Sequence, residues 1–162
     1  MGTEDAAARL VRQLFEYQST GRHAEAAAQF ADDAINNGRP ASGGRVAGIL
    51  ATLAEVFPDE RHDVEELLSD GELVAARVRF TGTHSAMPSV PFVLGGVLAG
   101  VPPTGRSVSV ADHHFFRVRN GRIAEHWGVR EDLEMARQLG ILPPGPDPAL
   151  TPTLTPAAKP GA

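Results

Sequence analysis

The chain has 162 residues, no cysteine and a formal net charge of -5. The lack of cysteine excludes disulfide scaffolds, cysteine-based zinc sites and thiol nucleophiles, and the acidic balance predicts that nucleic acid is not a partner. The first residues lack the basic start and apolar run of a secretory signal, and no uncharged stretch is long enough to cross a bilayer, so we expect a cytoplasmic protein without a membrane partner.

The last twenty residues differ in composition from the rest of the chain. They hold seven of the thirteen prolines, a residue that neither continues a helix nor donates inside a sheet. We therefore expect one folded domain over residues 1–142, followed by a disordered Pro/Ala/Thr-rich tail over residues 143–162.

Apolar side chains recur at helical spacing in three segments of the first third of the chain. This pattern predicts helices over residues 5–18, 22–30 and 46–57. A short strand is expected at residues 34–37, and a last helix over residues 131–139 ends at Gly140.

Between these helices the pattern is that of antiparallel strands. The turn signals Asp70-Gly71 and Asn120-Gly121 predict two hairpins. The strands of these hairpins are expected at residues 63–68 with 72–84 and at residues 108–118 with 122–129. Helices followed by antiparallel strands predict an α+β fold, in which three N-terminal helices pack on one face of a curved, mainly antiparallel sheet.

The strand expected at residues 72–84 has apolar side chains at its even positions as far as Phe80. Such alternation is typical of a strand with one buried face. His84 ends this row, where its imidazole either faces a cavity or is bonded to a nearby carbonyl or to solvent. We regard Phe80 and His84 as candidate substrate-binding residues.

The turn at Asn120-Gly121 decides which side chains of the second hairpin meet. A two-residue type I′ loop places His114 opposite Trp127, whereas a three-residue loop with a bulge at Gly121 places His114 opposite His126. In the three-residue case one face of the hairpin carries Asp112, His114, Phe116 and Val118 together with Arg122, Ala124, His126 and Gly128.

Asp112, His114 and His126 are the candidate catalytic residues in that second register. A carboxylate beside two imidazoles exchanges protons near neutral pH, because histidine titrates there and the carboxylate fixes its tautomer. The alternative is a buried polar network that only stabilises the sheet. A metal site is the weaker interpretation, because the chain has neither an HExxH motif nor two histidines at alternate positions of one strand.

Four motifs follow one another in a familiar order. They are Gly82-Thr83-His84, residues 102–106 (PPTGR), residues 120–128 (NGRIAEHWG) and Gln138-Leu139-Gly140. Together they resemble the SnoaL-like polyketide cyclases, also called ester cyclases. The resemblance implies a nuclear transport factor 2-like cone enclosing an apolar pocket, and ring closure by an intramolecular aldol reaction without a metal or an organic cofactor.

The resemblance also implies which residues act. The pocket of the family holds a histidine, matched by His114, and an asparagine near the second helix, matched by Asn36. The family has an acid directly after its His-Trp pair, where this chain has Gly128. Because that histidine and that acid share a face, we favour the three-residue turn, in which Asp112 lies opposite Gly128. We hypothesise that Asp112 replaces the missing acid.

The uncharged loop at residues 86–101 is longer than in the family. Its apolar side chains, Phe92 among them, form either a lid over the cavity or a cover for core or an oligomer interface. With Phe116, Phe92 is a further candidate for substrate binding. Phe115 and Trp127 fall on the opposite face of the hairpin, which leaves a homodimer open.

We therefore expect a cofactor-independent cyclase or isomerase, of the lyase or isomerase class, acting on a hydrophobic oxygenated small molecule of polyketide type by general acid/base catalysis. Two alternatives remain open. One is an epoxide-opening hydrolase or cyclase on the same fold, and the other is a non-catalytic small-molecule-binding protein, which the glycine at position 128 favours.

Overall fold

The architecture is a single curved sheet with helices on one side. The structure, a computed structural model, describes residues 5–89 and 96–145. The helices are α1 (Ala6–Ser19), α2 (His23–Ala28), α3 (Gly43–Val56) and α4 (Asp132–Gln138). The strands are β1 (Phe30–Asn36), β2 (Arg39–Pro40), β3 (Arg61–Asp70), β4 (Leu73–Thr83), β5 (Ser107–Arg119) and β6 (Arg122–Arg130).

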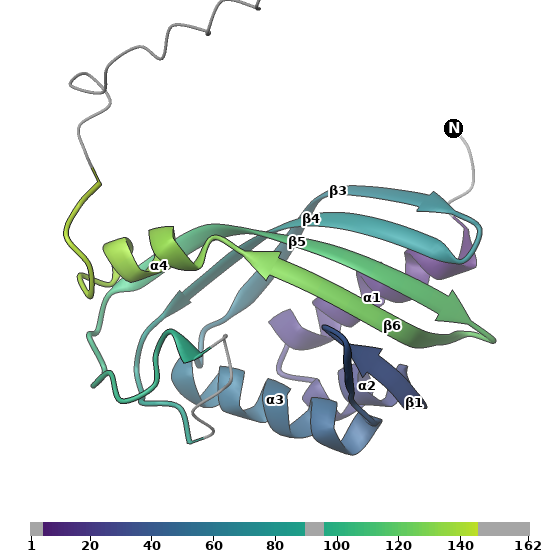
Figure 1. The fold of residues 1–162 in the computed structure, drawn as a ribbon, viewed down its shortest axis with the longest axis horizontal. Coiled ribbons are helices and arrows are strands. Elements are labelled where there is room, and N and C mark those ends of the chain that lie inside the picture. Colours follow the sequence, from purple (N-terminus) through teal and green to yellow (C-terminus); the bar gives the residue numbers. More distant parts are fainter. Residues whose placement is uncertain (1–4, 90–95, 146–162) are drawn as a thin grey trace, which may run out of the picture.

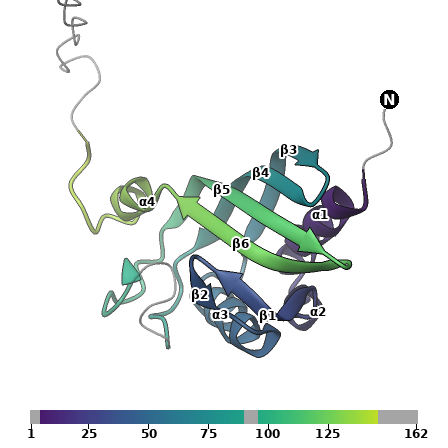
Figure 2. The same cartoon turned by 45° about the vertical axis from the view of Figure 1, so that its right-hand side comes forward.

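The strands lie in the order β2-β1-β6-β5-β4-β3, with β1 and β6 parallel and the other pairs antiparallel. Helices α1, α2 and α3 cover one face of this sheet (Figure 1). In the turned view the β5–β6 hairpin crosses over these helices and α4 lies beyond the end of β6 (Figure 2). The predicted α+β class and the placement of three helices against a curved, mainly antiparallel sheet are confirmed.

Helix α1 begins where a side chain satisfies one of its free amides. The carboxylate of Asp5 accepts a hydrogen bond from the backbone N–H of Ala8 at 2.8 Å, the usual role of an N-cap aspartate. Val11, Leu14 and Phe15 follow at helical spacing and are buried, so one stripe of the helix faces the sheet. Helix α1 thereby brings Phe15 to the inner face of the sheet.

The second predicted helix ends earlier than expected. It stops at Ala28, and Phe30 is instead the first residue of β1, where it pairs with Ile123 of β6. Phe30 is buried in either case, so burial alone does not distinguish the end of a helix from the start of a strand. The short strand β2 was not predicted, since its two residues are Arg39 and Pro40.

The turn between β5 and β6 is not the one that we favoured. Asn120 and Gly121 have φ angles of 50° and 72°, and Arg119 pairs with Arg122. Both central residues are therefore left-handed, as a two-residue type I′ turn requires. The predicted three-residue loop is wrong, because Asn120 accepts the left-handed conformation that was assigned to glycine alone.

A β-bulge next to this turn restores the predicted face. Val118 pairs with Ile123 but Arg117 pairs with Glu125, so Ala124 is the extra residue in β6. Beyond a bulge each side chain moves to the other face of the strand. Ile123, rather than Arg122 or Ala124 as predicted, therefore takes the buried position near the turn, while His126 returns to the inner face.

The C-terminal part of the loop at residues 86–101 packs into the core, whereas Met87 is exposed. Leu98 is fully buried in a cluster with Phe57, Phe80 and Met135, and Val97 packs against it. These two side chains cover core rather than a cavity. Phe92 and the tail beyond residue 145 lie outside the described residues, so the predictions made for them stay predictions.

The cluster around Phe57 leaves no room for a side chain at Gly82. A Cβ atom built there would lie 2.9 Å from the Cβ atom of Phe57, so we expect Gly82→Ala to lower the free energy of unfolding by about 1–3 kcal/mol through overpacking. The control is Gly48→Ala on the exposed side of α3, where nothing lies within 4 Å and a gain of about 1 kcal/mol is expected. Urea unfolding midpoints check both values, and equal stability of Gly82→Ala and wild type would contradict this packing.

Candidate functional site

The inner face of the β5–β6 hairpin gathers the chemistry-bearing side chains of this region. Asp112, His114 and Phe116 alternate along β5, and the pairing places His114 opposite Gly128 and Phe116 opposite His126. Alternate residues of a strand share a face. The predicted common face of Asp112, His114 and His126 is confirmed. The predicted pairs are wrong, because Gly128 rather than His126 lies opposite His114 and Arg130 rather than Gly128 lies opposite Asp112.

The two histidines are in direct contact. Nδ1 of His114 lies 2.9 Å from Nε2 of His126, and the rings stack with centroids 5.2 Å apart. Gly128 lies against this contact, because a Cβ atom at that position would lie 3.1 Å from Nδ1 of His114 and 3.2 Å from Nε2 of His126. A side chain at position 128 would therefore require the two imidazoles to shift by a few tenths of an ångström.

Each histidine has a second polar partner. Nδ1 of His126 lies 3.0 Å from Oδ1 of Asn36, and Nε2 of His114 lies 3.3 Å from Oδ1 of Asp112. Asn36 pairs with His126 across the parallel β1–β6 ladder. The result is a row of four polar side chains, Asn36–His126–His114–Asp112, across three neighbouring strands. We call it the polar row.

The partners fix one proton of the polar row. With the Asn36 oxygen as acceptor, His126 donates from Nδ1 and accepts at Nε2, so His114 donates from Nδ1. A bare Nε2 of His114 would then face the Asp112 carboxylate, which leaves two acceptors without a proton between them. Turning the Asn36 amide around reverses the donors and places a proton on Nε2 of His114, on the Asp112 side. The second arrangement is the one that gives every contact of the row a donor and an acceptor.

Burial and neighbouring charges set the protonation of the other two groups. Burial, aided by His114, lowers the pKa of His126 to about 3, although Asp112 acts in the opposite direction. Burial raises the pKa of Asp112, but its contact with His114 and the charges of His114, Arg130 and His62 lower it by more, so the net shift is downward. Near neutral pH, His126 is neutral and Asp112 is ionised.

Aromatic rings surround the polar row. Phe116 stacks on His126 with centroids 4.7 Å apart, and Phe15 of α1 lies 5.0 Å from His114. Phe30 meets His126 edge-on at 6.4 Å. Nε2 of His114 is buried, and although Asp112 lies 3.3 Å away, this nitrogen has no hydrogen-bond partner with good geometry among the described residues.

Two of the predicted substrate-binding residues lie elsewhere. His84 is fully buried eight positions along β4 from Ala76, the residue that pairs with His114. It contacts Phe57, and its Nδ1 accepts a hydrogen bond from the Thr104 backbone N–H at 3.2 Å. Phe80 belongs to the same end of the core, where it packs edge-on against Phe57. Eight residues of strand span about 25 Å, so His84 is remote from the polar row. Phe80 is four residues from Ala76, and its ring lies against His62 at 5.2 Å.

Sequence analysis missed three polar side chains near the polar row. Glu60 and His62 are buried and lie next to His23, the first residue of α2. Strand β3 begins at Arg61, two residues before the predicted start. The alternation of His62 with Val64 was the signal that places His62 on the inner face.

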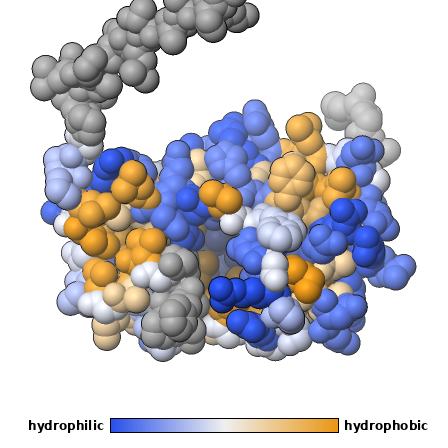
Figure 3. Space-filling model, in the orientation of Figure 1, coloured by the Kyte–Doolittle hydropathy of each residue, from blue (hydrophilic) through white to orange (hydrophobic). Residues whose placement is uncertain are grey.

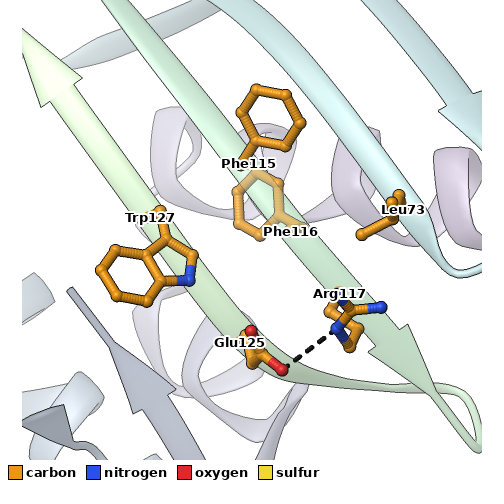
Figure 4. Close-up of a pocket in the computed structure, with 6 residues that line it drawn as sticks. All are labelled: Leu73, Phe115, Phe116, Arg117, Glu125 and Trp127. Atoms are coloured by element: carbon orange, nitrogen blue, oxygen red, sulfur yellow. Dashed lines mark hydrogen bonds and ion pairs between the residues drawn. The ribbon is translucent and has the colours of Figure 1, made fainter. Parts of the chain in front are cut away.

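The outer face of the sheet carries two shallow hollows, of about 310 and 520 Å³. Phe115 and Trp127 line both, and beside them Arg117 and Glu125 form an ion pair at 3.0 Å (Figure 4). The space-filling view shows polar and apolar side chains mixed over the sheet, with a larger apolar area at the α4 end (Figure 3). The predicted outward orientation of Phe115 and Trp127 is observed, since they are 58% and 48% exposed.

The part of the chain that the structure describes contains neither a metal-binding cluster nor a membrane-spanning helix. In residues 5–89 and 96–145, no group of three or more His, Asp or Glu side chains is arranged to hold a metal ion. Within the same ranges no helix combines the length and the apolar character needed to cross a membrane.

The low pKa of His126 makes the protein sensitive to acid. In the unfolded chain this histidine takes up a proton below about pH 6.5, whereas the folded state resists until about pH 3, so stability is lost as the pH falls through this window. Between pH 7 and pH 5 we expect His126 to account for a loss of up to about 2 kcal/mol. His126→Gln removes this part of the pH dependence, measured by urea unfolding at both pH values. The exposed neighbour His113 serves as control: His113→Gln keeps the wild-type slope, and an unchanged slope in His126→Gln would contradict the assignment.

Comparisons with known proteins agree with this geometry. The family model that matches is the SnoaL-like polyketide cyclase, over residues 7–139. Two curated relatives, both described as aklanonic acid methyl ester cyclases, are each 30% identical to this chain. DauD of Streptomyces sp. strain C5 matches over 146 residues, which cover 85% of this chain and 84% of DauD. DnrD of Streptomyces peucetius matches over 145 residues, which cover 85% of this chain and 93% of DnrD. The solved structure of IdmH from Streptomyces antibioticus is 29% identical and superposes with a TM-score of 0.68, covering 83% of this chain and 98% of IdmH. The chain belongs to the SnoaL-like polyketide cyclase family.

Proposed function

We propose that this protein is a cofactor-independent cyclase that closes a ring in a hydrophobic, oxygenated, polyketide-like molecule by general acid/base catalysis. One observation carries the proposal. The polar row holds an ionised carboxylate and a protonated imidazole nitrogen 3.3 Å apart in a buried apolar setting. A base and an acid are thus present side by side before a substrate arrives.

Asp112 is the base in this proposal. Its low pKa keeps it ionised near neutral pH, and its contact with His114 uses one of its two oxygens. The carboxylate removes a proton from a carbon next to a carbonyl group. Burial alone would strengthen this base, but the contact with His114 and the neighbouring charges outweigh burial, so the net shift of the Asp112 pKa in the free protein is downward.

His114 is the acid. Nε2–H donates to the oxygen of the carbonyl group that is attacked, and the proton passes to that oxygen as the new carbon–carbon bond forms. His126 and Asn36 hold His114 from the other side, at 2.9 and 3.0 Å along the row. The proton taken by Asp112 replaces the one given by His114, so no atom is gained or lost and the net reaction is an isomerisation.

A substrate reaches this acid only when side chains move, because Nε2 of His114 is buried. Phe15 lies against the His114 ring and comes from α1, whereas the polar row stands on strands. We therefore assign the opening movement to α1 and the Phe15 side chain. The sheet then keeps the acid and the base in position.

The relatives indicate which molecule to test first. DauD and DnrD are named as cyclases of aklanonic acid methyl ester, so this ester is the first candidate substrate for the present protein. Conversion is followed by liquid chromatography with mass detection, because ring closure shifts retention without changing mass. Asp112→Asn and His114→Asn are each expected to lower kcat by about 10²–10⁴, whereas His113→Asn on the outer face keeps the wild-type rate.

The outcomes distinguish a catalyst from a binding protein. Retained binding with lost turnover in Asp112→Asn supports the assigned base. Wild-type turnover in this variant would remove Asp112 from the mechanism. A wild-type protein that binds the ester and leaves it unchanged would contradict the proposal and favour the binding protein that Gly128 suggested.

A further inference from the structure

A second buried polar cluster lies next to the polar row and has no part in the mechanism above. Nε2 of His62 lies 3.3 Å from Oε2 of Glu60, and Nε2 of His23 lies 3.6 Å from the other oxygen of this carboxylate. The side chains of Glu60 and His62 are only 4% and 5% exposed. We call these three residues the Glu60 cluster.

The Glu60 cluster contributes less to the stability of the fold than apolar side chains in its place would. Charged and polar groups lose hydration on burial, and apolar side chains of the same volume stabilise a core at least as well. The cluster also leaves Nδ1 of His62 and Nδ1 of His23 buried without a hydrogen-bond partner among the described residues. Leaving such an atom buried and unpaired is unfavourable, which points to a role beyond stability.

His62 shares the interior of the fold with the polar row. The ring of Phe15 contacts both sides, stacking on His62 at 5.9 Å and tilting against His114 at 5.0 Å. A molecule that replaces Phe15 beside His114 therefore also meets His62.

Glu60 decides which nitrogen of His62 is free. A carboxylate only accepts hydrogen bonds, so the nitrogen that faces it, Nε2, carries the proton. In the neutral ring this contact leaves Nδ1 of His62 as a bare lone pair, whereas Nε2 of His114 is an N–H donor. The two histidines, on either side of the Phe15 ring, then carry opposite hydrogen-bonding groups.

We propose that His62 is a specificity-determining residue that accepts a hydrogen bond from a hydroxyl group of the substrate, while His114 donates to a carbonyl oxygen of the same molecule. The ligand class is thus a rigid, apolar hydroxy-ketone with its hydroxyl and carbonyl groups on different parts of the ring system. Glu60 is a positioning residue that fixes the tautomer of His62. This inference rests on the proposed function, because it assigns one more group of the same substrate.

The test uses two rigid tricyclic probes that differ at one oxygen. Emodin is a hydroxy-ketone, and physcion is the same molecule with its outer hydroxyl group methylated. A methyl ether cannot donate, so it leaves Nδ1 of His62 unpaired. Titration calorimetry of the wild-type protein is expected to give about tenfold tighter binding of emodin than of physcion.

Variants then locate the origin of that preference. His62→Phe suits the aromatic surroundings of Phe15 and Phe80 and is expected to reduce the emodin-to-physcion ratio to about one, with physcion bound as in wild type. Glu60→Gln is expected to lower the ratio less, because His62 remains but its tautomer is no longer fixed. His113→Phe on the outer face keeps the wild-type ratio.

A second measurement needs no variant. Nitrogen NMR of the histidine rings in the wild-type protein is expected to show Nδ1 of His62 unprotonated, with a shift on addition of emodin and none with physcion. A protonated Nδ1, or an unchanged ratio in His62→Phe, would overturn the inference and leave the proposed function intact. Failure of the wild-type protein to bind either probe would overturn the inference alone, because conversion of the ester tests the proposed function separately.

Discussion

The face on which each side chain of β6 lies depends on the single extra residue at Ala124. A type I′ turn without a bulge would direct Trp127 inward and His126 outward, because strand side chains alternate. The bulge reverses this assignment beyond Ala124, while Ile123, between turn and bulge, still reaches the core. The contact of His114 with His126 and the contact of His126 with Asn36 both follow from this local irregularity.

Gly128, in the same region, affects the site because it has no side chain. Gly128 lies opposite His114, and its bare Cα leaves the space in which two imidazoles meet at 2.9 Å. The glycine at this position, where the resemblance leads one to expect an acid, goes together with a neutral His126 beside a protonated His114 nitrogen. The carboxylate of the row sits at Asp112, one alternate position along β5 from His114 and next to its Nε2.

Much of this arrangement follows from local sequence pattern, and the remainder depends on contacts between distant segments. Alternation along residues 72–84 and 108–118 places Ala76, His114 and Phe116 on one face, and Asn120-Gly121 marks the hairpin. No glycine or proline marks the bulge at Ala124 in the sequence. Its effect on the shared face was predicted from the family resemblance through a different turn.

The positions of Glu60 and Phe15 were beyond local pattern. Glu60 precedes β3, and its neighbours His23 and His62 come from separate elements, so only the packing of α1 and α2 on the sheet brings them together. Phe15 is an ordinary apolar residue of an amphipathic helix in the sequence. Its contact with two histidines depends on the crossing of α1 over β3 and β4.

The separation between strands and helices bears on how such a protein acquires new ligands. The proton-exchanging groups stand on β5 and β6, whose spacing is set by the backbone ladder, while the ring against His114 comes from α1 through Phe15. Substitutions on α1 therefore reshape the space around a ligand and leave the acid and the base at their distance. Selection on this helix, in nature or in the laboratory, is a route to altered substrate range that does not require the chemistry to be rebuilt.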